Sequence, residues 1–114
     1  MNDCIFCKII EKKIPSKIAY EDDKVIAFHD INPQAPVHIL IVTKKHFDSI
    51  MDITGDDAIE IAHVFSVIQK LAVELGITEK GFRIVNNCGA EGGQTVPHVH
   101  FHLLAGRYMQ WPPG

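Results

Sequence analysis

The sequence predicts an α+β fold in which a five-stranded, mostly antiparallel sheet is combined with one long and one short helix. Three observations support this prediction. Apolar residues recur at spacings of three and four over residues 56–75, which is the pattern of an amphipathic helix. Residues 37–42 are almost all apolar, as expected of a strand at the centre of a sheet. Histidine and apolar residues alternate over residues 98–103, as in a half-buried strand.

The composition indicates one globular domain over residues 1–114, because 46% of the residues are apolar and 22% are charged. The net charge of −3 disfavours nucleic acid or an anionic membrane as a partner. No apolar run is long enough to span a membrane, and the first residues lack a signal-peptide pattern. Three cysteines do not make the disulfide framework of a small secreted protein, so we expect a cytoplasmic location.

The first predicted element is a short helix over residues 4–12. Its apolar side chains fall on one side of a helix at spacings of three and four. Asp3 has the short polar side chain that suits an N-cap. Pro15 stops any longer helix, because proline lacks a backbone donor and clashes with the preceding turn.

Two short strand-like runs follow at residues 17–21 and 24–30, and together they predict a hairpin. A loop marked by two prolines covers residues 31–36. It leads into the apolar strand at residues 37–42, which we expect at the centre of the sheet.

The long helix predicted over residues 56–75 carries a capping signal at each end. Thr54 and Asp57 resemble a capping box with aspartate in place of glutamate, and Gly76 suits the left-handed cap at the C-terminus. The expected buried stripe consists of Ile59, Ala62, Phe65, Ser66, Ile68, Leu71, Ala72 and Leu75.

The last two predicted strands cover residues 81–87 and 98–104, and the short loop between them predicts antiparallel pairing. On the second strand, His98, His100 and His102 share one face while the apolar residues between them face the core. Such a row spans about 13 Å, which is too long for all three rings to bind one metal ion. The row suits an extended anion. A zinc ion shared by two neighbours and an accidental polar face are the alternatives.

The same stretch resembles the signature of the histidine triad (HIT) family, in which three histidines alternate with apolar residues. Here the run is His-Val-His-Phe-His-Leu-Leu at residues 98–104. The ending at residues 106–114, which closes with Trp-Pro-Pro-Gly, is similar to that of the family's nucleotide-binding branch of nucleoside phosphoramidases. The resemblance covers nearly the whole chain and implies the HIT-like α+β fold.

The resemblance and the chemistry of imidazole together predict a covalent mechanism. A neutral imidazole is a competent nucleophile, because histidine has an ordinary pKa near 6.5. We expect the central His100 to attack the α-phosphorus of a nucleotide and form a nucleotidyl-histidine that water hydrolyses. The backbone carbonyl of His98 is expected to hold the other ring nitrogen. His102 and His38 are expected to hydrogen-bond the phosphate oxygens.

The resemblance implies a nucleotide site around this row. It places Asn87, Gln94 and Thr95 at the phosphate or the leaving group. It places Asp30 at the ribose hydroxyls, for which a carboxylate is a suitable acceptor. The apolar slot for the purine consists of Phe6, Ile9, Ile14, Phe28, Ile31 and Leu40. The alternative for these apolar residues is an ordinary role in the core.

The C-terminal tail and the cysteines carry two further implications of the resemblance. Trp111 in the tail is expected to cross a twofold homodimer and contribute to the partner's site, with residues 56–75 and 81–87 at the interface. Cys4, Cys7, His46 and His98 are expected to bind a structural zinc ion with four protein ligands. Two small buried thiols are the alternative for the cysteine pair.

The expected function is hydrolysis of the P–N bond of purine nucleoside phosphoramidates, such as AMP linked to an amine. Three other hypotheses stay open at this point. They are a dinucleoside polyphosphate hydrolase of the same family, a nucleotide-binding adaptor without catalysis, and a zinc hydrolase with its metal at the histidine row. The Trp-Pro-Pro-Gly ending argues against the first of these.

Overall fold

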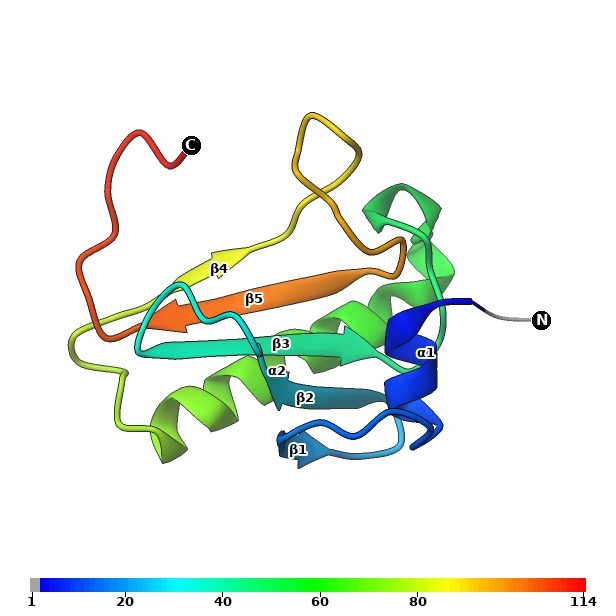
Figure 1. The fold of residues 1–114 in the computed structure, drawn as a ribbon, viewed down its shortest axis with the longest axis horizontal. Coiled ribbons are helices and arrows are strands. Elements are labelled where there is room, and N and C mark those ends of the chain that lie inside the picture. Colours follow the sequence, from blue (N-terminus) through cyan, green and yellow to red (C-terminus); the bar gives the residue numbers. More distant parts are fainter. Residues whose placement is uncertain (1–2) are drawn as a thin grey trace.

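The computed structural model describes residues 3–114 and contains one five-stranded sheet with helices against both of its faces (Figure 1). The strands are β1 (Ile18–Glu21), β2 (Val25–His29), β3 (Val37–Thr43), β4 (Arg83–Val85) and β5 (His100–Ala105), and the helices are α1 (Ile5–Ile10) and α2 (Ala58–Glu74). The strand order is β1-β2-β3-β5-β4, and every neighbouring pair is antiparallel. The predicted fold class is therefore confirmed, including the pairing of the last two strands.

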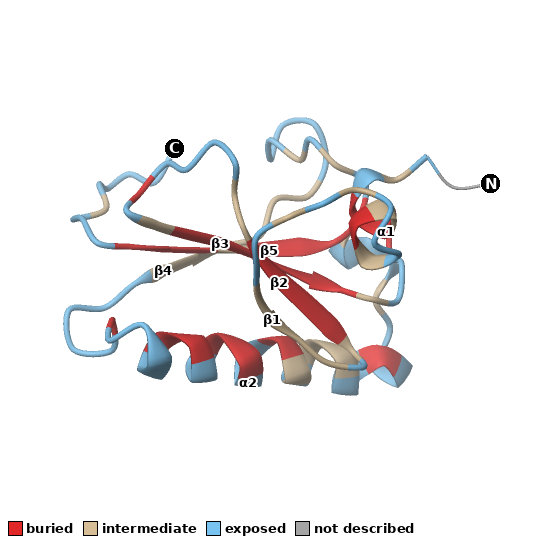
Figure 2. Ribbon diagram, turned by 60° about the horizontal axis from the view of Figure 1, so that its bottom comes forward, coloured by how far each residue is buried: buried red, intermediate tan, exposed pale blue. Residues whose placement is uncertain are grey.

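The long helix α2 covers one face of the sheet and turns its buried side toward the strands (Figure 2). The core between them includes Ile39, Ile41 and Val25 from the strands and Val64 and Ile68 from α2. Apolar burial of this kind contributes about 25 cal/mol per Å² of surface removed from water. The helix is thus held by packing against the sheet, and this layer supports the central strands β3 and β5.

The short helix α1 packs against the opposite face of the sheet. There Phe6 and Ile9 meet Phe28 and Leu40, and the four side chains form a second, smaller apolar cluster with their neighbours. Strand β5 contributes to both faces, because its side chains alternate. Phe101 and its apolar neighbours enter the core beneath α2, whereas the histidines of β5 lie on the face that carries α1.

The ends of α2 follow the sequence prediction, but its buried stripe differs. Thr54 and Asp57 form the capping box, and Gly76 takes the left-handed conformation with φ of 68°. The residues that face the sheet are Val64, Val67, Ile68, Leu71 and Ala72. The predicted Ile59, Phe65 and Leu75 are exposed instead. The helix carries apolar residues on more than one side, and the fit to the sheet decides which side is buried.

Other boundaries also differ from the prediction. The N-cap of α1 is Cys4 rather than Asp3, because the Cys4 sulfur accepts a hydrogen bond from the Cys7 amide. Strand β4 has only three residues, and β5 begins at His100, so His98 lies before the strand. Within residues 3–114 no helix has the length and apolar character needed to cross a membrane.

A cluster around Asp22 ties the β1–β2 hairpin to α2. The Asp22 carboxylate accepts hydrogen bonds from the Tyr20 hydroxyl, the amides of Lys24 and Val25, and the His63 ring on α2. Burial by itself would raise the pKa of this carboxyl, but the four hydrogen bonds together hold the pKa well below its ordinary value. The folded state therefore favours the ionised carboxylate.

We expect Asp22→Asn to lower the free energy of unfolding at pH 7 by about 2 kcal/mol, because hydrogen bonds to a charged acceptor are the stronger ones. Because the pKa of Asp22 is lower in the folded than in the unfolded state, where it is about 3.9, its stabilising effect is complete above that pH and decreases as the pH falls below it. The difference in unfolding free energy between the variant and the native protein should therefore be smaller at pH 3 than at pH 7. Urea unfolding at pH 3 and pH 7 measures this difference. Asp23→Asn is the matched control, since Asp23 is exposed.

Candidate functional site

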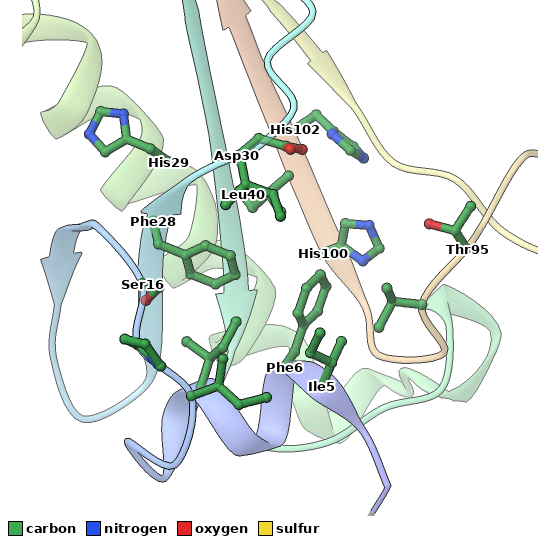
Figure 3. Close-up of a pocket in the computed structure, with 15 residues that line it drawn as sticks. Ile5, Phe6, Ser16, Phe28, His29, Asp30, Leu40, Thr95, His100 and His102 are labelled. Atoms are coloured by element: carbon green, nitrogen blue, oxygen red, sulfur yellow. The ribbon is translucent and has the colours of Figure 1, made fainter.

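A pocket of about 400 Å³ opens on the sheet face that carries α1 (Figure 3). Helix α1, the segment after it, the ends of β2 and β5, and the loop before β5 form its walls. Its lining residues are Ile5, Phe6, Ile9, Ile14, Pro15, Ser16, Phe28, His29, Asp30, Ile31, Leu40, Thr95, Val96, His100 and His102. The six residues predicted for the apolar slot are all among them, together with Asp30, Thr95, His100 and His102.

The apolar part of the pocket is built by α1 against the sheet. The rings of Phe6 and Phe28 meet edge to face with centroids 5.6 Å apart, and the Phe6 ring also lies 4.9 Å from the His100 ring. Leu40 on β3 is paired in register with His102 on β5, so it brings an apolar surface next to the histidines. The slot is thus continuous with the reactive end of the pocket, which suits a ligand with one flat apolar part and one charged part.

His100 is buried, and its orientation is fixed by the backbone. Its Nδ1–H donates to the carbonyl of His98 over 2.7 Å, which is the contact expected from the sequence. A neutral ring with a proton on Nδ1 has no proton on Nε2. Among residues 3–114 no hydrogen bond occupies that Nε2. Burial lowers the pKa of His100, and the bond to His98 only partly opposes it, so the ring is neutral at pH 7.

His102 is oriented by a chain of hydrogen bonds that starts at a backbone amide. The Gln34 amide donates to Nδ1 of His38 over 3.0 Å, so a neutral His38 carries its proton on Nε2. That Nε2–H donates to Nδ1 of His102 over 2.9 Å, which leaves His102 with a proton on its own Nε2. Burial lowers the pKa of both rings, for His102 to about 4. This end of the pocket therefore presents an acceptor nitrogen on His100 beside a donor nitrogen on His102.

Asp30 follows β2 and lies between the histidines and the apolar slot (Figure 3). One carboxylate oxygen accepts from the Asn32 amide over 2.8 Å. The other lies 3.5 Å from Nε2 of His38. The carboxylate is thus held in place and retains acceptor capacity for hydroxyl groups of a ligand.

Besides the cysteines, His46 and His98, four predicted site residues are absent from the lining of this pocket. His38 lines a neighbouring hollow, and both of its ring nitrogens are engaged, by the Gln34 amide and by His102, so it orients His102 instead of lining the pocket. The Gln94 side chain is engaged with the backbone of Gly89, Asp48 and Val96, so it braces the loop before β5. Asn87 lines a neighbouring hollow on the other side of His102, together with residues of the C-terminal tail. Trp111 is 81% exposed.

Sequence reasoning missed several residues that the fold brings to the site. Asn86 donates from its side chain to the carbonyl of His100 over 2.9 Å and so fixes the first residue of β5. Ser16 and His29 line the pocket, as do Ile5, Pro15 and Val96. No local pattern marks them, because they reach the pocket through the path of the chain around α1 and the loop before β5.

A second cluster lies next to the pocket and consists of Cys4, Cys7, His46 and His98, whose ligand atoms all fall within 4.8 Å of one another. Nδ1 of His98 is 3.3 Å from the Cys4 sulfur, and Nδ1 of His46 is 3.3 Å from the Cys7 sulfur. Two thiols and two imidazoles in one place make the donor set that zinc prefers for a tetrahedral structural site.

Hydrogen bonds prepare both imidazoles of this cluster for a metal. Nε2–H of His98 donates to the carbonyl of Thr43, and Nε2–H of His46 donates to the Asp48 carboxylate, each over 2.7 Å. Each neutral ring therefore presents an unprotonated Nδ1 to the sulfurs, as ligating histidines do. Burial lowers the pKa of His98 to about 4.

The placement of His98 corrects one expectation from the sequence. The three histidines do not form a continuous row for an anion, because His98 precedes β5 and its fully buried ring belongs to the Cys/His cluster. Its backbone carbonyl still contacts His100. His98 thus joins the two clusters, with its ring in one and its carbonyl in the other.

Comparison with known proteins gives the family. Residues 11–109 match the model of the HIT domain. The chain belongs to the HIT family. Among curated HIT relatives, the 14 kDa zinc-binding protein of Zea mays is 48% identical, over 96% of this chain and 87% of that protein. The family resemblance seen in the sequence is therefore confirmed.

Solved HIT structures share the fold throughout. A HIT family hydrolase from Legionella pneumophila is 47% identical with a TM-score of 0.96, and the match covers 98% of this chain and 100% of that one. A histidine triad nucleotide-binding protein from Candida albicans is 37% identical with a TM-score of 0.81, over 89% of this chain and 73% of that one. This HIT protein is therefore hydrolase-like, with a fold that nucleotide-binding relatives share.

Proposed function

We propose that this protein hydrolyses the P–N bond of purine nucleoside phosphoramidates through a covalent intermediate on His100. The observation that carries the proposal is the unprotonated Nε2 of His100, set by the bond from Nδ1 to His98, in a pocket whose other end is an apolar slot. The phosphate would lie at His100 and His102, the ribose at Asp30, and the purine in the apolar slot that Phe6 and Phe28 line.

The proposed reaction has two steps. Nε2 of His100 attacks the phosphorus, and the P–N bond to the amine breaks while the leaving nitrogen takes up a proton from solvent, which the water of the second step returns. Water then breaks the bond between phosphorus and Nε2 and releases a nucleoside monophosphate and the neutral ring. The Nε2–H of His102 donates to a phosphate oxygen and stabilises the charge that develops there. Two easier displacements replace a single difficult one.

We further propose that Cys4, Cys7, His46 and His98 hold a zinc ion. Four protein ligands leave no open position, so the ion would be structural and would supply no catalytic water. It would join α1 to the segments that follow β3 and precede β5. Reduced thiolate ligands are consistent with the cytoplasmic location that we propose for the protein.

We also propose a C2 homodimer built on α2 and β4, in which the tail carries Trp111 toward the partner's site. Exposed apolar side chains on and near these elements support this proposal, because water-exposed apolar surface is typical of interfaces. They are Ile59, Phe65, Val73, Leu75 and Phe82. Asn87 and the hollow that contains it would then lie beside the tail, outside the pocket in which we place the phosphate.

The hydrogen bonds of the histidines disfavour the alternative hypothesis of a zinc hydrolase with its metal at the histidine row. Asp30, His38 and His102 are close enough to hold an ion. A metal on Nε2 of His38 would move the ring proton to Nδ1, where it would face the donating amide of Gln34. Kinetic measurements distinguish the proposed phosphoramidase from a nucleotide-binding adaptor without catalysis and from a dinucleoside polyphosphate hydrolase.

We expect kcat/KM for an adenosine phosphoramidate to exceed that for a diadenosine polyphosphate by roughly a hundredfold or more, which corresponds to about 3 kcal/mol of transition-state binding. Steady-state assays of both substrates with one enzyme preparation measure the ratio. A ratio in favour of the polyphosphate would assign the chain to that branch. Absence of turnover on both substrates, with AMP bound, would favour the adaptor.

A further inference from the structure

The side chain of Ser16 stands out by its unused hydrogen-bonding capacity. Within residues 3–114 its Oγ is the one buried side-chain nitrogen or oxygen atom that has no hydrogen-bond partner. Buried polar groups are normally paired, because an unpaired one has lost its contacts with water and gained nothing in return. The Oγ is covered as it stands, so it meets a ligand in the pocket only by turning about χ1, and no hydrogen bond opposes that turn.

Ser16 lies in the segment between α1 and β1, and it lines the proposed nucleotide pocket. Figure 3 shows it at the opposite end of the pocket from His102 and Thr95, with Asp30 near His102 and Phe28 between Ser16 and His100. Pro15 and Phe28 lie beside it, and His29 at the end of β2 is the other polar lining residue on this side of the pocket. Ser16 therefore offers a hydroxyl at a mainly apolar end, away from His100 and His102.

This position corresponds to one edge of a bound purine. With the phosphate at His100 and the ribose at Asp30, the base extends away from the histidines. The part of a purine farthest from the ribose is the N1–C6 edge, which carries the 6-amino group of adenine or the 6-oxo group of guanine. A serine hydroxyl both donates and accepts, and no hydrogen bond holds its rotamer here, so it can pair with either base.

We propose that the Ser16 hydroxyl hydrogen-bonds the N1–C6 edge of the bound base and so selects purines that carry polar atoms there. This inference rests on the proposed function, since it uses the placement of the phosphate and ribose given above. It adds a residue that reads the base in a slot otherwise made of apolar contacts. The contact does not discriminate adenine from guanine, because the hydroxyl rotates to suit either.

Ser16→Ala tests this contact by calorimetric titration with AMP. The variant should bind AMP about three- to tenfold more weakly than the native protein, which is the size of one hydrogen bond. The loss should persist with 7-deaza-AMP, which keeps the N1–C6 edge. The loss of affinity should disappear with 1-deaza-AMP if the hydroxyl contacts N1, and with purine riboside 5′-monophosphate if it contacts the 6-amino group. A loss of equal size for all four ligands, or no loss with AMP, would overturn the proposal.

Thermal unfolding without ligand gives an independent readout. The apo variant should be at least as stable as the native protein, because the substitution removes an unpaired polar atom. A lower Tm would assign the hydroxyl to the fold and overturn the proposal. Ser66→Ala, an exposed change on α2, is the matched control and should alter neither property. If the native protein binds AMP while Ser16→Ala binds it equally well, the proposed function stands and this inference alone fails.

Discussion

His100→Ala is expected to lower kcat for a nucleoside phosphoramidate roughly ten-thousand-fold or more, because the covalent route disappears with its nucleophile. The neighbouring His102 does not replace it. Its Nε2 carries the proton that the chain from Gln34 and His38 assigns to it, so it is a donor and lacks the lone pair for attack.

Two measurements separate loss of chemistry from loss of the pocket. AMP should bind His100→Ala within a few-fold of the native affinity. Mass spectrometry of native enzyme quenched during turnover should find a nucleotide adduct on His100 and none on the variant. His63→Gln removes a histidine from α2 on the opposite face of the sheet and should keep native turnover. Turnover by His100→Ala at the native rate would refute the nucleophile assignment.

Cys7→Ser is expected to remove bound zinc and to lower the free energy of unfolding by about 4 kcal/mol, or roughly 15 °C in Tm. The expected effect is large because Cys7 is buried and its sulfur lies within reach of two imidazoles. The lost ion would also release the connection between α1 and the segments around His46 and His98. Elemental analysis of the purified protein and thermal unfolding with and without a chelator measure both parts.

The third cysteine provides the matched control. Cys88 lies outside the Cys/His cluster, so Cys88→Ser should retain zinc and stability. A chelator should lower the Tm of the native protein and of Cys88→Ser but leave that of Cys7→Ser unchanged. Zinc content near zero in freshly purified protein that has met no chelator would rule out the proposed site.

The sequence was informative where the structure follows a local period. Alternation along β5 correctly separated His100 and His102 from Phe101, because side-chain direction in a strand is a property of neighbouring residues. The same rule failed at His98. The chain before His100 is not in the strand, and the ring of His98 is held by Thr43 and the cysteines instead.

Contacts between distant segments were not predictable from local patterns. Asn86, rather than its neighbour Asn87, braces the start of β5, and nothing in the sequence distinguishes the two amides. Ser16 reaches the pocket only because the segment after α1 passes beside β2. The buried side of α2 was misassigned for a similar reason, since apolar residues such as Ile59 and Val64 lie on different sides and only the sheet selects between them.

Strand β5 uses one backbone for two tasks. Phe101 and Leu103 fill the core beneath α2, while the intervening His102 and the preceding His100 present their rings to the pocket. If a residue of different volume replaced Phe101 or Leu103, the core could adapt by a shift of β5. That shift would also move the rings of His100 and His102. A substitution at these two positions can therefore leave the protein folded and still lower its activity, because catalysis depends on the exact position of the rings. A screen that detects only folded protein would count more substitutions as acceptable than evolution can accept.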